Sequence, residues 1–306
     1  GVQTCALPIS EVLYTYYSTR NTLTRIHQKS ADLRHVVQTA LERNRKKYDL
    51  QSKQLKGTEK RDKYKVYGEL INTYGYNLEP GSKELTALNY YTNEEITIPL
   101  DPTQTPGENA QRYFAKYNKQ KRTFEALTEL IQETADDIQY LESISNALDI
   151  ALSEADLAQI KEELMQSGYI RRKHTKKKVK LTSKPMHYIS SDGYDMYVGK
   201  NNLQNEELTF SFANGNDWWF HAKGAPGSHV IVKSGGDELP DRTFEEAGRL
   251  AAYYSKNRGA DKVEIDYIQK KHVKKPNGAK PGFVVYYTNY SLVIDSDISN
   301  IKNVQD

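Results

Sequence analysis

Residues 105–152 read TPGENAQRYFAKYNKQKRTFEALTELIQETADDIQYLESISNALDIAL, and they carry the most regular hydrophobic pattern of the 306-residue chain. A heptad register continues through the following residues: Tyr117, Phe124, Leu127, Ile131, Ile138, Leu141, Leu148 and Leu152. Thr105, Pro106 and Glu108 supply an N-cap, a proline suited to the first helical position and a capping-box glutamate. The pattern predicts one long helix over about residues 107–148, with a coiled-coil seam.

A weaker seam predicts a second long helix over about residues 18–56. Its apolar positions alternate spacings of three and four, and they are Leu23, Ile26, Leu33, Val37 and Ala40. Each helix would span roughly 60 Å at 1.5 Å per residue. Between them, residues 57–106 indicate a short helix at 64–74 and strands near 88–91 and 96–100. We expect a long antiparallel coiled-coil arm with a small α+β tip insert.

The second half of the chain changes to short elements. Ser191-Asp192-Gly193 predicts a hairpin turn between strands at 186–190 and 194–198. Helices are expected at 202–212 and from the capping box Thr243–Glu246 to about residue 259. Further strands are expected at 218–221, 229–233, 262–267, 283–287 and 291–294. The fold class is therefore a mixture of α and α/β elements, in which the arm is followed by a separate α+β domain.

Composition excludes several protein classes. The chain is 37% hydrophobic and 27% charged, with a mean hydropathy of −0.78, and it has no apolar run of the ~18–20 residues that a membrane helix needs. Its 23 tyrosines argue against a disordered chain. One cysteine excludes a disulfide framework and a Cys-rich zinc module, and it favours a reducing, cytoplasmic setting.

The first nine residues, GVQTCALPI, are set apart from the rest. They lack an initial methionine, a basic region and the apolar core of a secretory signal. We interpret residues 1–9 as a sequencing artefact and expect the chain to be the C-terminal part of a longer product.

Charge is concentrated in the second half. From residue 171 onward there are 22 Lys and Arg against 16 Asp and Glu. Seven of the ten residues in RRKHTKKKVK, 171–180, are basic. Such a run is typical of a linker or of a segment that binds an anionic partner. We expect domain boundaries at 10–170, a basic linker at 171–184 and a domain at 185–306. The candidate RNA contacts in the linker are Arg171, Arg172, Lys173, Lys176 and Lys177.

The segment DWWFHAKGAPGSHVIVK, 217–233, combines aromatic residues with glycines and lysines. Side chains alternate along a strand, so the three consecutive aromatic residues cannot all face one core, and at least one should reach a surface or groove. The loop at 223–228 lets backbone amides approach a phosphate. Candidate RNA contacts are Trp218, Trp219, His221, Lys223, Gly227, Ser228 and His229. The alternative is a β-hairpin with an aromatic core.

A second lysine cluster lies in QKKHVKKPNGAKPG, 269–282. Its members are Lys270, Lys271, Lys274, Lys275 and Lys280. Clustered lysines bind polyanions with release of counterions, which makes affinity depend on salt. Lysine-rich loops also occur for solubility alone. Together with the aromatic segment and the basic linker, this cluster favours RNA or ribosome binding.

Catalysis has weaker support. His221 and His229 have no metal-ligand spacing and no nucleophile in a triad arrangement. The sequence contains no Walker loop, no GxGxxG after a strand, and no HExxH or GxSxG motif. We expect no enzyme activity, cofactor or metal, and histidines with a structural role at strand ends.

Several long strings resemble one family. The segments VGKNNLQNEELTF (198–210), DWWFHAKGAPGSHVIVK (217–233), EEAGRLAAYYSK (245–256) and VKKPNGAKPGFVVYY (273–287) are similar to the NFACT-R domain. ENAQRYFAKYNK (108–119) and YLESI (140–144) resemble the coiled-coil middle region of the same proteins. The resemblance covers nearly all of residues 10–306, and it is strongest to bacterial members, which are also called fibronectin-binding protein A-like.

The resemblance implies ribosome-associated quality control. Members bind large ribosomal subunits blocked by peptidyl-tRNA and recruit alanyl-tRNA for C-terminal tailing of the stalled chain. It implies the large subunit, rRNA and tRNA as partners, with no membrane and no small-molecule substrate. The N-terminal domains that carry most tRNA recognition are expected to lie outside this chain, so binding without tailing is expected. The alternatives are a surface fibronectin-binding adhesin and, third, an enzyme using the two histidines.

Overall fold

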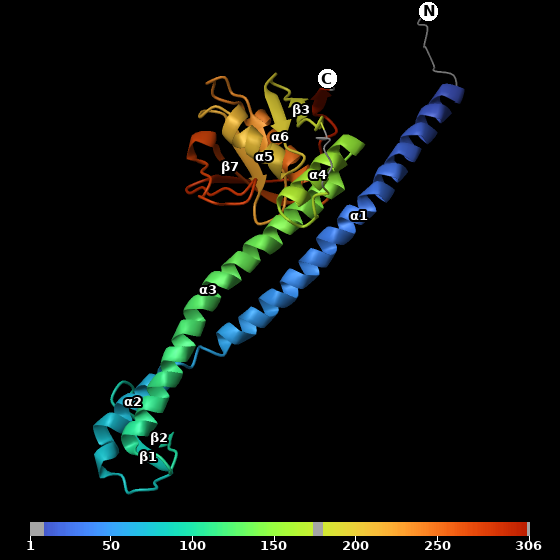
Figure 1. Ribbon diagram of the computed structural model, residues 1–306. Coiled ribbons are helices and arrows are strands. Elements are labelled where there is room, and N and C mark those ends of the chain that lie inside the picture. The colour runs from blue at the N-terminus through green and yellow to red at the C-terminus, as the bar shows by residue number, and fades with distance from the viewer. Residues whose placement is uncertain (1–8, 174–179, 305–306) are drawn as a thin grey trace, which may run out of the picture. The chain divides into compact units, whose positions relative to one another are not determined.

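The computed structural model describes residues 9–173 and 180–304, and its contacts divide the chain into two compact units (Figure 1). Of the described residues, the sheet unit combines 9–42 with 139–173 and 180–304, and the insert unit is 43–138. Two long helices, α1 (Ile9–Lys56) and α3 (Pro106–Ile150), contribute to both units. No helix within the described ranges is both long and apolar enough to cross a bilayer.

The start of α3 has the capping box that the sequence predicts. The backbone N–H of Thr105 donates to Glu108 Oε2 at 2.8 Å, and the N–H of Glu108 donates to Thr105 Oγ1 at 3.2 Å. Pro106 is the first helical residue, where its missing N–H costs no hydrogen bond. The helix ends at Ile150, so Leu152 lies beyond it and is exposed, against the predicted seam.

Side-chain contacts link α1 and α3 inside each unit. In the sheet unit, Arg34 pairs with Asp149 at 2.7 Å and donates to the carbonyl of Leu148 at 3.0 Å. In the insert unit, Thr134 donates to Gln51 Oε1 at 2.9 Å. The residue nearer the end of α1, Gln51, contacts the earlier part of α3, and Arg34 contacts the later part. The two helices therefore run antiparallel within each unit. In the seam predicted for residues 18–56, Leu23 is exposed, while Ile26, Leu33 and Val37 are buried.

The insert unit contains a helix and a hairpin. Helix α2 (Asp62–Tyr74) and the short η1 (Gly75–Asn77) are followed by strands β1 (Glu84–Asn89) and β2 (Glu94–Pro99), which pair antiparallel. Both strands begin earlier than predicted. The buried side chains that form its core are Leu70, Ile71, Leu85, Ala87, Ile98, Leu100, Ala110 and Tyr113.

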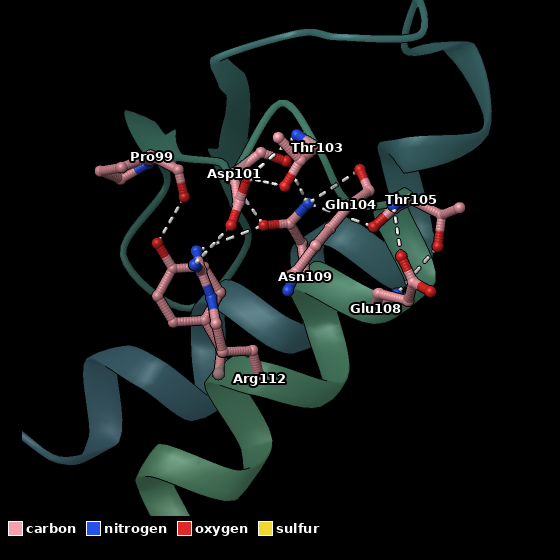
Figure 2. A network of polar contacts seen from close by, with 9 residues as sticks. Pro99, Asp101, Thr103, Gln104, Thr105, Glu108, Asn109 and Arg112 are labelled. Atoms are coloured by element: carbon pink, nitrogen blue, oxygen red, sulfur yellow. Dashed lines mark hydrogen bonds and ion pairs between the residues drawn. The ribbon is translucent and has the colours of Figure 1, made fainter.

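A buried asparagine holds the hairpin against the first turn of α3 (Figure 2). Asn109 accepts the N–H of Asp101 at 2.8 Å and donates through its amide nitrogen to the carbonyls of Asp101, Gln104 and Thr105. Arg112 reaches the same group from one turn further along α3, and it lies 3.6 Å from the Asp101 carboxylate. One side-chain amide therefore pairs with a backbone N–H and three backbone carbonyls of the connection between β2 and α3.

In the sheet unit, seven antiparallel strands lie in the order β8-β7-β5-β6-β4-β3-β9. Their bounds are β3 (Met186–Ile189), β4 (Asp195–Val198), β5 (Trp218–Ala222), β6 (Val230–Val232), β7 (Val263–Gln269), β8 (Tyr290–Ile294) and β9 (Lys302–Val304). Its helical elements are α4 (Glu154–Gln166), α5 (Asn202–Glu207), the π-helical η2 (Leu208–Phe212), α6 (Asp241–Tyr253) and η3 (Lys270–His272). Helix α6 packs on one face of the sheet (Figure 1).

The β3–β4 hairpin forms as predicted, with Gly193 at φ +88° in its turn. The capping box predicted at Thr243–Glu246 is wrong, because α6 begins earlier, at Asp241. Thr243 donates instead to Ser190 and Asp192, and Glu246 accepts the N–H of Ser191 at 2.8 Å. Both side chains therefore fasten the hairpin to α6.

The strand predicted at 283–287 is also wrong. That segment forms only a single bridge, between Val285 and Lys274. The predicted helix at 202–212 is present, but it changes from α-helical to π-helical geometry at Leu208. Val284 and Tyr286 of this segment pack against the core on the face of the sheet opposite α6, without forming a further strand.

We expect Asn109→Asp to lower the free energy of unfolding of the insert unit by about 2–3 kcal/mol. The substitution keeps the shape, but it turns a carboxylate oxygen toward the carbonyls that now receive the Asn109 amide. Urea unfolding followed by circular dichroism measures the change. Asn118→Asp, at an exposed position of the same helix, is the matched control. Equal losses for the two variants would contradict the role assigned to Asn109.

Candidate nucleic-acid interface

The three aromatic residues of β5 are shared between two cores. Trp218 packs edge-on against Phe244 with ring centres 4.9 Å apart, and Phe220 stacks on Tyr267 at 5.4 Å. Both belong to the core under α6. Trp219 points to the other face and is 1% exposed. The predicted alternation is confirmed, and all three side chains pack in a core, as in the aromatic-core alternative.

Trp219 lines a cavity of about 280 Å³ within the sheet unit. The end of α3, helix α5, strand β5, the loop after it and the segment at 281–286 form the walls. The principal lining residues are Tyr140, Ser143, Asn202, Asn205, Trp219, His221, Gly227, His229, Gly282 and Tyr286. Of the residues proposed from sequence, this cavity brings together Trp219, His221, Gly227 and His229.

Aromatic rings are arranged closely at this cavity. The His221 ring is nearly parallel to Trp219, with an interplanar angle of 8° and centres 5.7 Å apart. His229 stands edge-on to both rings, 5.2 Å from Trp219 and 5.7 Å from His221. The Tyr286 ring lies 4.9 Å from Trp219. These rings therefore pack against one another beside the cavity, at separations typical of aromatic contacts.

Burial keeps both histidines uncharged. It lowers the pKa of His221, and burial together with the neighbouring His221 ring lowers the pKa of His229 to about 3. His229 Nδ1 is 2.8 Å from Thr209 Oγ1, and the His229 backbone N–H donates to Asn205 Oδ1 at 3.0 Å. Across the described ranges no group of three or more His, Cys, Asp or Glu is placed to hold a metal.

The wall contributed by α3 is polar. Tyr140 donates to the buried Glu163 Oε1 at 2.9 Å and also contacts Ser167. Asn202 donates to Ser143 Oγ at 2.7 Å. Burial raises the pKa of Glu163 to about 7, although hydrogen bonds from Asn202 and Tyr140 oppose the shift.

Sequence reasoning did not single out the polar residues of this wall. Tyr140 and Ser143 stand in the predicted seam helix, where a polar or aromatic residue has no distinctive signal. Asn202 and Asn205 are buried in a short helix, and asparagine is seldom buried without a hydrogen-bonding role. The sequence shows only their residue type, so no signal for this role was available before the structure.

The loop after β5 is fastened to neighbouring segments. Lys223 pairs with Glu264 at 2.7 Å, and the N–H of the buried Ser228 donates to the carbonyl of Tyr254 at 3.1 Å. A side chain at Gly227 would come within 3.1 Å of Ser255. The backbone amide of Ser228 is therefore already used, which leaves less of this loop for the phosphate contact expected from sequence.

The lysine cluster begins at η3. Lys271 and Lys274 are exposed and Lys270 is half-buried. Lys275 pairs with Glu206 at 2.5 Å, and Lys280 Nζ lies 5.1 Å from the centre of the Tyr140 ring.

In the basic linker, Arg171, Arg172 and Lys173 are exposed, and Arg172 pairs with Glu162 at 2.5 Å. Lys176 and Lys177 lie outside the described residues.

We expect Glu163→Gln to remove a pH dependence of stability. The folded chain keeps the Glu163 proton up to about pH 7, whereas the unfolded chain loses it near 4.5. The free energy of unfolding therefore falls as pH rises through this window, by about 3 kcal/mol. The glutamine variant should lack this slope and be more stable than the parent at pH 8, as measured by thermal unfolding.

Glu162→Gln is the neighbouring control. Glu162 pairs with Arg172, which lowers the pKa of its carboxyl, so its stabilising contribution is lost only in acid. This variant should keep the slope between about pH 5 and pH 8. Parallel pH profiles for the parent and Glu163→Gln would show that Glu163 does not titrate in this range.

Comparison with known families assigns both parts of the chain. Residues 3–183 match the family described as NFACT N-terminal and middle domains, and residues 184–287 match the NFACT protein RNA binding domain. A solved structure, the C-terminal part of the fibronectin/fibrinogen-binding protein of Streptococcus suis, is similar with a TM-score of 0.72 and 37% identity. The similarity covers 91% of this chain and 99% of that one.

Curated relatives agree with this result. The protein named Rqc2 homolog RqcH from Streptococcus pneumoniae D39 is 41% identical over 97% of this chain and 54% of its own length. The Bacillus subtilis protein of the same name is 38% identical over 96% of this chain and 52% of its own length. The chain thus spans about half the length of the curated relatives it matches. Because the two family matches together run from residue 3 to residue 287, the chain belongs to the NFACT family.

Proposed function

We propose that this chain binds RNA through its sheet unit and acts in ribosome-associated quality control by contacting the large ribosomal subunit. The match of residues 184–287 to an RNA binding domain carries the proposal. The exposed Lys271 and Lys274, which follow β7, supply positive charge suited to phosphates. The relatives named Rqc2 homolog RqcH support the ribosomal setting.

The two long helices fit the role of an arm within this proposal. α1 and α3 have 48 and 45 residues, so each helix is roughly 70 Å long at about 1.5 Å per residue. We propose the boundaries 10–170 for the arm with its insert, 171–184 for the basic linker and 185–306 for the RNA-binding domain. rRNA is the direct partner, with tRNA as a further one, in the cytoplasm.

Tailing of the stalled chain belongs, in this proposal, to the portion of the relatives that this chain does not match. The chain itself acts as a binding factor and not as an enzyme. Fibronectin binding, the alternative from sequence, rests on the name of the Streptococcus suis protein. Nothing observed in residues 9–173 and 180–304 favours it over RNA binding.

We expect the double variant Lys271→Ala and Lys274→Ala to sediment less with free large subunits in a sucrose gradient of bacterial lysate. Each lost phosphate contact should also reduce the salt slope of RNA affinity by about one. The parent should co-migrate with subunits at low salt, less so at moderate salt, and not after RNase treatment.

The control is the double variant Lys262→Ala and Lys302→Ala, which removes the same charge from other exposed positions of the sheet unit. Lys262 precedes β7, at the opposite end from η3, and Lys302 lies on β9 at the far edge of the sheet. Equal effects of the two double variants would refute a contact at η3. A parent protein that stayed at the top of every gradient would refute subunit binding by this chain.

A further inference from the structure

We propose that the cavity beside Trp219 receives a single unstacked base of a single-stranded RNA segment. The inference rests on the proposed RNA binding and goes beyond it, because it assigns a base-sized site and a mode of contact. Charged loops hold the RNA backbone in any sequence, whereas a cavity of this kind holds one base.

The size of the cavity and the rings beside it suit one planar ring system. Its volume of about 280 Å³ lies just under the roughly 300–1,000 Å³ typical of ligand pockets. Three protein rings lie close together there, namely Trp219, His221 and Tyr286. Proteins that bind single-stranded RNA stack its bases on such rings.

A residue that lines the cavity carries a hydrogen-bond donor without a partner. The indole N–H of Trp219 is buried and has no hydrogen-bond partner among the residues that the structure describes. A buried donor without a partner costs free energy unless a ligand accepts from it. Ring nitrogens and carbonyl oxygens of bases are acceptors, and the side-chain amides of Asn202 and Asn205 add groups that commonly pair with base edges.

The distribution of charged residues around the cavity indicates where the base and the phosphate of a nucleotide would each lie. Of the described residues, those that line the cavity include no lysine or arginine and one acidic residue, Glu142, which disfavours a phosphate there. Burial lowers the pKa of both His221 and His229, so neither supplies a positive charge. Lysines instead adjoin the lining: Lys223 precedes Gly224, and Lys280 precedes Pro281. A nucleotide whose base enters the cavity would leave its phosphate near these lysines. An isolated phosphate would find no cation inside.

The chain provides its own spectroscopic reporter for this site. It has two tryptophans, and Trp218 lies in the opposite core, so Trp218→Phe leaves Trp219 as the sole indole. The full 306-residue chain with this substitution is titrated with a single-stranded RNA of about six nucleotides. The comparison strand has the same sugar-phosphate backbone without bases.

We expect the base-containing strand to change Trp219 emission and to bind about tenfold more tightly than the abasic strand, a difference within the range of one base stacked on an aromatic ring. His221→Ala in the same background should remove most of that difference and leave the affinity for the abasic strand unchanged. His187→Ala is the matched control, since it removes a strand histidine stacked on Tyr197, outside the cavity. Circular dichroism verifies that each variant is folded.

The outcomes separate this inference from the proposed function. Equal binding of the two strands, with unchanged Trp219 emission, would overturn the base site and leave RNA binding intact. Absence of binding to either strand would overturn both. A change in emission with free nucleoside monophosphates, combined with equal binding of the two strands, would assign the cavity to free nucleotides and overturn the RNA assignment.

Discussion

The sheet unit depends on β5 being buried on both faces. Because side chains alternate along a strand, Phe220 enters the core under α6 while Trp219 enters the core on the other side. β5 pairs with β6 and β7 near the middle of the sheet, so its backbone hydrogen bonds are also satisfied on both edges. A shift of one residue in register would exchange the two faces and place Trp219 under α6. The position of the cavity is thus fixed by the same constraint that fixes the sheet.

The cavity wall then depends on residues distant in sequence. Tyr140 and Ser143 come from the end of α3, about sixty residues before α5, yet Ser143 accepts the amide of Asn202 at 2.7 Å. Behind them the buried carboxyl of Glu163 receives the Tyr140 hydroxyl. Buried polar groups of this kind are tolerated only when they are hydrogen-bonded, so the network holds the end of α3 against α5 in one arrangement.

Local signals in the sequence predicted most elements, because the forces behind them are local. The capping box at Thr105 and Glu108 and the turn at Gly193 are set by neighbouring backbone groups, and both are present. Thr243 and Glu246 have the same spacing but bond to the β3–β4 turn, which is some fifty residues away. The segment 283–287 has the composition of a strand, yet its residues Val284 and Tyr286 pack on the core opposite α6 and the segment does not join the sheet. Trp219, His221 and His229 of the cavity were identified from sequence, while Tyr286 and the polar wall depend on contacts that no local pattern encodes.

Exposed lysines and an aromatic cavity without lysine or arginine in its lining would bind RNA through different interactions. Contacts of Lys271 and Lys274 with phosphates would weaken as salt rises, since their free energy comes largely from counterion release. Stacking on Trp219 and His221 involves uncharged rings, so it should depend little on salt. Charge alone gives affinity for any RNA, including duplex regions whose bases are already stacked. A cavity that accepts an unstacked base favours single-stranded or distorted segments, and this preference is what a factor needs if it must find one site on a surface made largely of RNA.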